Sequence, residues 1–359
     1  MAAATTDLPL VYSADQLLDS GGYDSPLIAD GVRCHGGFDE DGLYRSPRTL
    51  HRGPAIEAWQ NQVVREGGEL IQIDRALMPP QYPNTQQAKL LLQHGVRDPI
   101  VRALTIISIV EGFGAVIRDV AVPDLSECVV EPVAGTALAH LSGGLFEAHA
   151  RDESGWREEG GHKQMWEAAR DLALENPKIP GDVLLRLMAR GGQRQRPEGP
   201  LPELATKLER LITMMAQVLV VEVFAEGTFQ WGIDLLSDPE VSAEPTRAGD
   251  MVRFIQSDES PHVEYLRTAL SELRARTLRT TDGGTLSGRE AVDRVLHRML
   301  SDMTRRRPEE QRADVRDDLA TEAKKAGVGG SFLDEFDALQ TAWSAPEQTG
   351  FEPTDTAQG

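Results

Sequence analysis

The chain has 359 residues, 40% of them hydrophobic, and a formal net charge of -20. This amount of apolar material is enough for a large core, so the composition excludes a wholly disordered chain. The acidic balance argues against a surface for nucleic acid or for anionic lipid, and we expect neither as a partner.

The ends and the apolar stretches of the chain bear on its location. Residues 1–16, MAAATTDLPLVYSADQ, lack the basic start and apolar centre of a signal peptide. The longest apolar stretches are interrupted by Glu111 in one case and by Glu222 and Glu226 in the other, so we expect no membrane span. Two cysteines, Cys34 and Cys128, are too few for a disulfide framework. We therefore expect a cytoplasmic protein.

Residues 1–95 are predicted to form a largely irregular N-terminal extension. They are rich in glycine, proline and aspartate, as in DSGGYDSPLIADGVRCHGGFDEDG and ALMPPQYPNTQQ. One helix is predicted near 53–68, GPAIEAWQNQVVREGG. No stretch shows the alternation that is typical of strands, so the predicted fold class is all-α.

From about residue 96 the pattern becomes helical. Long helical stretches are predicted at 98–119, 134–174, 204–236 and 247–276, with a shorter helix at 181–191. The first and third of the long ones are apolar on nearly every side, which is typical of buried central helices. We assign 96–276 to one helical domain, 277–345 to further amphipathic helices, and 346–359 to a polar tail.

The stretch 247–276 carries two polar residues on its core-facing line. Glu259 and His262 fall among apolar residues spaced by three and four, and burying such a pair is costly without partners. Pro261 leaves two alternatives open. It either kinks one continuous helix or begins a second helix with Ser260 as N-cap, which would leave Glu259 outside.

Glu159 and His162 repeat the same spacing. Each Glu-x-x-His pair places both side chains on one helix face, because three residues rotate a helix by about 300°. An acid precedes each pair, Glu158 in one and Asp258 in the other. The glycines at 160 and 161 are poor helix formers that either make room beside the pair or allow close helix packing.

The two apolar stretches supply candidate partners for these pairs. Glu111 is the only acid within 101–118, and Glu222 and Glu226 are the only acids within 211–231. The segments VEGFGAVIRD and AEGTFQWGID both contain Glu-Gly, with an aspartate eight residues after the glutamate. This repeated pattern favours Glu226 over Glu222 as the counterpart of Glu111.

Two single glutamates and two Glu-x-x-His pairs on four helices form a known ligand pattern for two bridged metal ions. In this spaced set of glutamates and histidines, residues 98–276 resemble the ferritin-like di-iron carboxylate superfamily. That superfamily includes rubrerythrins, ribonucleotide reductase small subunits, multicomponent monooxygenases and N-oxygenases. The resemblance implies a ferritin-like four-helix bundle with an N-terminal extension and a C-terminal helical extension.

The resemblance also implies a ligand set and a cofactor. One iron ion would be held by Glu111, Glu159 and His162, and the other by Glu226, Glu259 and His262, with Glu159 and Glu259 bridging. Glu222 and His149 are the alternative ligands. Oxygen ligands with two imidazoles suit iron, and manganese in one or both positions is an alternative. The competing interpretation is that each Glu-x-x-His is an ordinary buried ion pair, which leaves Glu111 and Glu226 unexplained.

The predicted function is a di-iron oxygenase or oxidase. It would use dioxygen and an unidentified electron donor to oxidise a small organic substrate by hydroxylation, N-oxygenation or desaturation. The alternatives are ferritin-like iron oxidation and storage, or a metal-binding scaffold, and a homodimer is possible. The long extensions favour the enzyme, because they offer material to shape a substrate pocket. Candidate pocket residues, with core packing as the other interpretation of the aromatic ones, are Gly112, Phe113, Trp166, Gly227 and Phe229.

Overall fold

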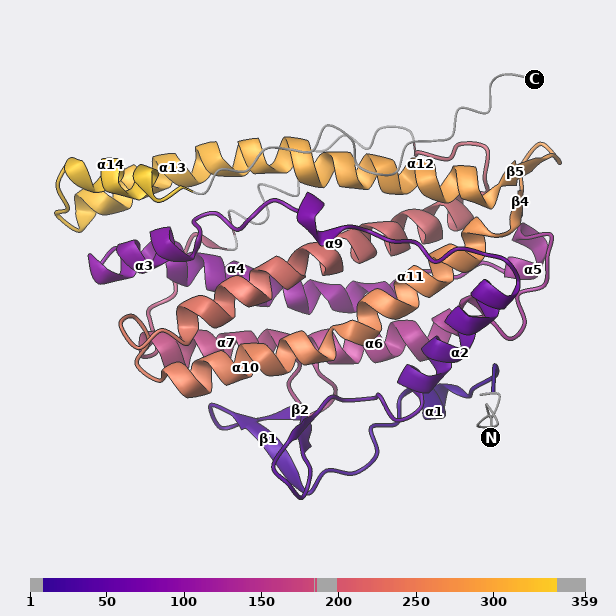
Figure 1. Cartoon of the computed structure of the whole chain (residues 1–359), viewed down its shortest axis with the longest axis horizontal. Coiled ribbons are helices and arrows are strands. Elements are labelled where there is room, and N and C mark those ends of the chain that lie inside the picture. The colour runs from indigo at the N-terminus through magenta and orange to yellow at the C-terminus, as the bar shows by residue number, and fades with distance from the viewer. Residues whose placement is uncertain (1–8, 184, 186–198, 341–359) are drawn as a thin grey trace, which may run out of the picture.

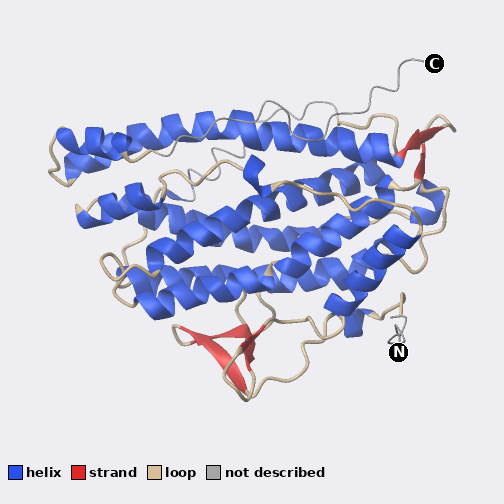
Figure 2. Ribbon diagram, viewed as in Figure 1, coloured by secondary structure: helices blue, strands red, loops and turns tan. Residues whose placement is uncertain are grey.

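The computed structural model of the protein is mainly helical, with two small antiparallel sheets (Figures 1 and 2). It describes residues 9–183, 185 and 199–340. The prediction of a mainly helical chain is confirmed, whereas the expectation that strands are absent is wrong.

Six α-helices form the centre of the protein. α4 lies along α7 and α6, α10 lies between α7 and α9, and α11 packs against α9 (Figure 1). Their bounds are α4 Asp98–Gly114, α6 Phe146–Ser154, α7 His162–Leu174, α9 Thr206–Leu236, α10 Pro245–Asp258 and α11 Ser260–Arg274. α9 is apolar on almost all sides because it is surrounded by α10, α11 and α12 (Gly288–Ser301).

The long stretch predicted at 134–174 is interrupted. It begins with short helical turns, η3 (Ala137–His140) and η4 (Leu141–Leu145), and α6 then ends at Ser154. The chain leaves the helix at Gly155 (φ +82°), where a Cβ would overlap the carbonyl oxygen of Glu159. It resumes as α7 at His162, and Gly161 returns so close to Gly155 that a Cβ there would overlap the Gly155 nitrogen. Residues 155–161 are therefore a loop inserted into a helix whose two halves meet.

At Pro261 the break between two helices is only one residue long. α10 ends at Asp258 and α11 begins at Ser260, and Glu259 between them keeps helical dihedrals, φ -78° and ψ -23°. Proline lies in the first turn of α11, where its missing N–H leaves no hydrogen bond unmade. Both alternatives are thus partly right: a new helix starts here, yet Glu259 and His262 stay on one face.

The N-terminal segment is more regular than expected. It contains α1 (Ala14–Leu17), α2 (Arg52–Arg65), η1 (Arg75–Leu77) and α3 (Thr85–Gln93). It also forms a three-stranded sheet of β1 (Ser25–Ala29), β2 (Val32–Phe38) and β3 (Tyr44–Arg45), in the order β1-β2-β3. The predicted helix at 53–68 corresponds to α2. The sheet was missed because its strands are short and contain glycine and proline, which hide the alternation.

Strand β2 is tied to the inserted loop. The His35 N–H donates to the Gly160 carbonyl at 2.9 Å, and the Gly160 N–H donates to the Arg33 carbonyl at 2.8 Å. The backbone of Gly160 therefore pairs with strand β2. The sheet lies beside α6, α7 and α10 in Figure 1 and brings residues of the N-terminal segment to the centre of the helical unit.

The C-terminal part begins with a hairpin, β4 (Thr277–Arg279) paired with β5 (Thr285–Ser287). α12 follows, then a π-helical turn η5 (Asp302–Arg306), α13 (Arg307–Lys325) and α14 (Ser331–Ala338). α12 packs on α9 and α11, and α13 packs on α4. The short helix α5 (Leu125–Cys128) lies near β4.

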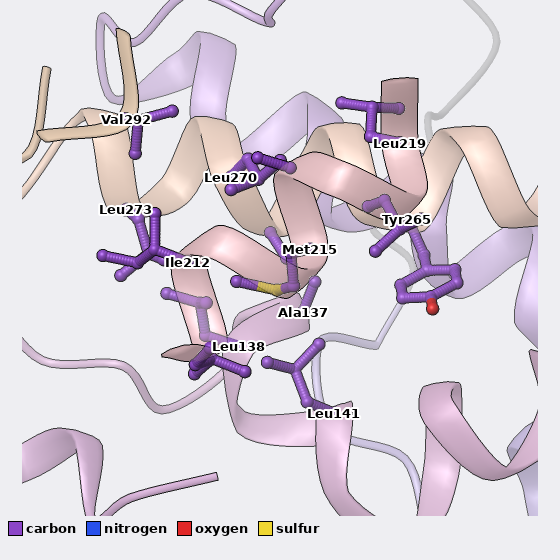
Figure 3. Close-up of a cluster of buried hydrophobic side chains, with 14 of the residues drawn as sticks. Ala137, Leu138, Leu141, Ile212, Met215, Leu219, Tyr265, Leu270, Leu273 and Val292 are labelled. Carbon is purple, nitrogen blue, oxygen red and sulfur yellow. The ribbon is translucent and has the colours of Figure 1, made fainter. Parts of the chain in front are cut away.

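Buried apolar side chains form two clusters. One includes residues of α2, α9, α11 and α12, and Figure 3 shows part of it, with Met215, Tyr265 and Leu270 among the labelled side chains. The other includes residues of α3, α7, α10 and α14. Each central helical segment contributes residues to both clusters, and the buried acids and histidines lie between the two clusters. On α10 and α11, for example, Ile255 belongs to one cluster, Tyr265 to the other, and Glu259 and His262 lie between them.

The helical segment Asp98–Asp119, α4 with η2 (Ala115–Asp119), is by length and composition the one described helix that could cross a membrane. The expectation of no span-length apolar stretch is therefore wrong. This segment packs along α6 and α7 and carries Glu111, although Val110, Phe113 and Val116 on its outer side are exposed.

Candidate metal centre

Buried acids and histidines from α4, α6, α7, α9 and α11 meet between the two apolar clusters. We call two groups of them position A and position B. Position A lies between Glu111, Glu153, His162 and Glu259, and position B lies between His149, Glu153, Glu222 and His262. In each group the candidate ligand atoms all lie within 4.8 Å of one another, which is close enough to hold a metal ion.

In position A the imidazole of His162 faces three carboxylates. Its Nδ1 lies 2.9 Å from Glu259 Oε1, 3.5 Å from Glu153 Oε1 and 3.7 Å from Glu111 Oε2. Glu111 comes from α4, Glu153 from the end of α6, and His162 from the start of α7. The close return of the inserted loop makes this possible, because it brings Gly161, and with it the start of α7, back to the end of α6.

Position B contains two imidazoles. His149 Nε2 lies 3.5 Å from Glu222 Oε1 and 3.7 Å from Glu153 Oε1, and its ring stacks on that of His262 with centroids 3.9 Å apart. His262 Nδ1 lies 3.2 Å from Glu153 Oε1 and 2.7 Å from Glu259 Oε2. Glu153 and Glu259 therefore approach histidines of both positions.

Many of these atoms have no hydrogen-bond partner among the described residues. They are His149 Nε2, His162 Nδ1, His262 Nδ1 and both side-chain oxygens of Glu259. Buried polar atoms are nearly always satisfied, and these lie close together without hydrogen-bond geometry. Lone pairs that converge in this way fit cations in the two positions. Four carboxylates would balance the charge of two divalent ions, so the donor set also fits in charge.

Without such ions the buried charges shift one another strongly. Burial, together with repulsion from Glu153, raises the pKa of Glu111 well above its usual value, and burial with repulsion from Glu259 does the same for Glu222. Burial also opposes ionisation of Glu259, but the charges of His162 and His262 outweigh it and lower its pKa. The site therefore combines acids that favour protons with acids that do not, which is a feature of functional sites.

The residue before each central glutamate lies beside a histidine of the opposite helix. Asp152, before Glu153, accepts from His262 Nε2 at 2.9 Å. Asp258, before Glu259, lies 3.5 Å from His162 Nε2. In both cases the Nδ1 atom faces the centre. The other nitrogen of His262 is fixed by a carboxylate, as expected for a ligand, whereas Nε2 of His162 has no hydrogen-bond partner among the described residues.

Of the six predicted ligands, the structure brings Glu111, His162, Glu259 and His262 together. Glu159 lies in the inserted loop, where its half-exposed side chain (39%) pairs with Arg33 at 3.2 Å. It fails to reach the site because the residues around it are not helical, so the three-residue spacing to His162 does not place both on one face.

Glu226 also lies outside both groups. It contacts Gln256 and Arg75, whereas Glu222, one turn earlier on α9, reaches position B. The two residues share one helix face, so only the register of α9 against its neighbours decides between them. The repeated Glu-Gly pattern favoured Glu226, but Glu226 does not occupy a position in the site equivalent to that of Glu111. Of the alternative ligands, Glu222 and His149 both lie in position B.

Glu153 is not among the ligands predicted from the sequence, although a signal was present. Asp152-Glu153 mirrors Asp258-Glu259, and His149 precedes Glu153 by one helical turn. The seven residues from Gly155 to Gly161 hide the matching histidine. If six of these seven residues are treated as an insertion, Glu153 and His162 have the spacing of a Glu-x-x-His pair.

The predicted pocket residues lie in different surroundings. Trp166 and Phe229 are buried and stacked on each other within the apolar cluster around α7 and α10, which supports core packing. Gly112 faces the side chain of Lys163, Gly227 has open space around it, and Phe113 is exposed (61%). They do not line one common cavity that the structure records.

In comparisons with known proteins, no family model, no curated protein and no solved structure matches the chain. The established result is a mainly helical protein with buried clusters of histidine, glutamate and aspartate that could bind metal ions.

Proposed function

We propose that this protein is a di-iron oxygenase or oxidase of the ferritin-like type, built on a four-helix bundle of α4, α6 with α7, α9, and α10 with α11. The observation that carries the proposal is the pair of adjacent positions that share Glu153, with Glu259 facing a histidine of each position. Two positions joined by shared carboxylates are the hallmark of dinuclear centres in helix bundles. A set of ordinary buried ion pairs would not leave the inward-facing nitrogens and oxygens without hydrogen bonds.

The donor types favour iron, with manganese as the alternative in either position. Carboxylate oxygens suit manganese, imidazole nitrogens suit iron, and no thiolate lies in either group. When bound, reduced iron would supply the electrons for dioxygen chemistry. The protein residues would hold the ions, fix the His262 imidazole through Asp152, and exclude water with the two apolar clusters.

Glu111 and Glu222 mark the side from which reactants would approach. Their side chains are 11% and 10% exposed, whereas the other residues of positions A and B are between 0% and 5% exposed. These two glutamates stand on α4 and α9. A small organic substrate and dioxygen would enter there, and an electron donor of unknown identity would complete the reaction. The proposal places the protein in the cytoplasm.

Ferrous iron titration separates the enzyme from its alternatives. The protein is stripped of metal, loaded anaerobically with ferrous iron, and exposed to dioxygen in a stopped-flow instrument. The proposal predicts about two iron ions per chain and about one dioxygen consumed per pair, after which the reaction stops until electrons are supplied. Uptake of many more ions under air would indicate iron storage, and binding without a reaction with dioxygen would indicate a metal-binding scaffold.

A further inference from the structure

Positions A and B are not equivalent in their donors. Position A offers one imidazole, that of His162, among carboxylates. Position B offers two, from His149 and His262. The Nδ1 atom of His149 is engaged by the Tyr265 hydroxyl at 3.2 Å, and Tyr265 is fully buried. This contact turns Nε2 of His149 toward position B, so the second imidazole belongs to that position.

The carboxylates behind the histidines also differ. Asp152, which supports His262 of position B, is bound by two buried guanidinium groups. Arg48 Nε donates to its Oδ1 at 2.6 Å and Arg52 Nη1 donates to its Oδ2 at 2.8 Å. Both arginines come from the N-terminal segment, and each carries a permanent positive charge. Two cations therefore outweigh the single negative charge of Asp152.

Asp258, which lies 3.5 Å from His162 Nε2 of position A, accepts a hydrogen bond from a neutral group. Tyr44 donates to its Oδ2 at 2.8 Å, and His35 Nε2 lies 3.3 Å from the same atom. The tautomer of His35 is fixed by Arg48, whose Nη2 lies 3.3 Å from His35 Nδ1. Because a guanidinium can only donate, Nδ1 accepts, and the proton of the neutral ring is on Nε2, which lies near Asp258 without a hydrogen-bond partner among the described residues.

Both differences act in the same direction. A nearby carboxylate that keeps its full charge makes an imidazole a stronger, more anionic donor, and a carboxylate neutralised by arginine does so less. Position A is therefore oxygen-rich and more anionic, and position B is nitrogen-rich and less anionic. Affinity for first-row divalent ions rises from manganese to iron, and the rise is steeper where imidazoles replace carboxylates.

We propose that the two positions discriminate between metals: position B selects ferrous iron over manganese, and position A accepts manganese when iron is limiting, with His149 as the residue that sets the difference. This inference rests on the proposed dinuclear centre. It assigns a role to the N-terminal segment, since that segment supplies the arginines behind position B and the tyrosine and histidine behind position A.

Anaerobic loading with both metals tests the inference. Metal-free protein receives one equivalent each of ferrous iron and manganese, excess is removed, and the ions are located by anomalous diffraction at the two absorption edges. We expect iron between His149 and His262 and manganese beside His162, with a preference of roughly tenfold or more. The His149→Asn variant is expected to bind both metals with the preference lost.

A second variant, Tyr265→Phe, keeps the inference testable if His149→Asn fails to fold. It keeps the ring and removes only the hydroxyl that orients His149, so it is expected to fold and to show a weakened preference. Equal mixing of iron and manganese in both positions of the unaltered protein would overturn the inference while leaving the dinuclear centre intact. A protein that binds neither metal would overturn the inference and the proposed function together.

Discussion

Replacing Glu153 by glutamine is expected to abolish tight metal binding, whereas the same change at Glu159 is expected to leave it unaltered. The two residues are six apart in the sequence and provide a matched pair. Glu153 Oε1 lies 3.2 to 3.7 Å from nitrogens of His149, His162 and His262, so it faces both positions. Glu159 forms one partly exposed pair with Arg33.

The expected magnitude follows from the geometry. Removing one unit of charge at about 4 Å from another costs about 4 kcal/mol at an effective dielectric constant near 20, which corresponds to roughly a 1,000-fold loss of affinity. The loss is larger for a divalent ion. Exposed pairs such as that of Glu159 contribute about 1 kcal/mol or less to stability, and this one contributes nothing to the site.

The assay is anaerobic titration with cobalt as a spectroscopic substitute for iron, combined with metal analysis after desalting. We expect about two ions per chain in the unaltered protein and in Glu159→Gln, and less than one in Glu153→Gln. Circular dichroism confirms that each variant is folded. Loss of metal in Glu159→Gln with retention in Glu153→Gln would refute the geometric assignment and favour the assignment made from sequence spacing.

Three further results are expected. Glu222→Gln reduces metal content and Glu226→Gln does not, as metal analysis of the two variants would show; the reverse result would mean that the register of α9 differs. Arg52→Met leaves Asp152 with one cation fewer, and breaking such a buried pair costs about 3–5 kcal/mol of unfolding free energy in urea denaturation; an unchanged midpoint would contradict this. Burial raises the pKa of Glu272 to about 7 from 4.5, although two backbone N–H groups of η3 donate to it. The folded protein then binds more protons than the unfolded one between those values, so stability falls by roughly 3 kcal/mol as pH rises from about 4.5 to about 7. Glu272→Gln is expected to flatten that part of the profile, and an unchanged slope would exclude Glu272 as its source.

The helical character of the protein could be predicted because periodicity reports which side of a helix is buried. The same reasoning located Glu259 and His262, since a carboxylate and an imidazole on a core-facing line need partners. It located Glu111 because a lone acid in an apolar helix has the same need. These are local signals, and a single sequence is enough to detect them.

The remaining parts depend on tertiary structure. Glu159 was chosen because its spacing to His162 fits a helix, yet an inserted loop there folds back onto strand β2. Glu226 and Glu222 have the same periodicity, and only packing of α9 separates them. The arginines at 48 and 52 reach Asp152 across about a hundred residues of chain, a distance over which no spacing rule applies.

Anomalous diffraction from crystals of the iron-loaded protein tests the dinuclear centre most directly. The account predicts two iron peaks between α4, α6, α7, α9 and α11, with Glu153 and Glu259 contacting both ions, Glu222 contacting one, and Glu159 and Glu226 contacting neither. A folded, iron-treated protein with no peak among these residues would contradict the account. Peaks bound by Glu159 or Glu226 would contradict it equally.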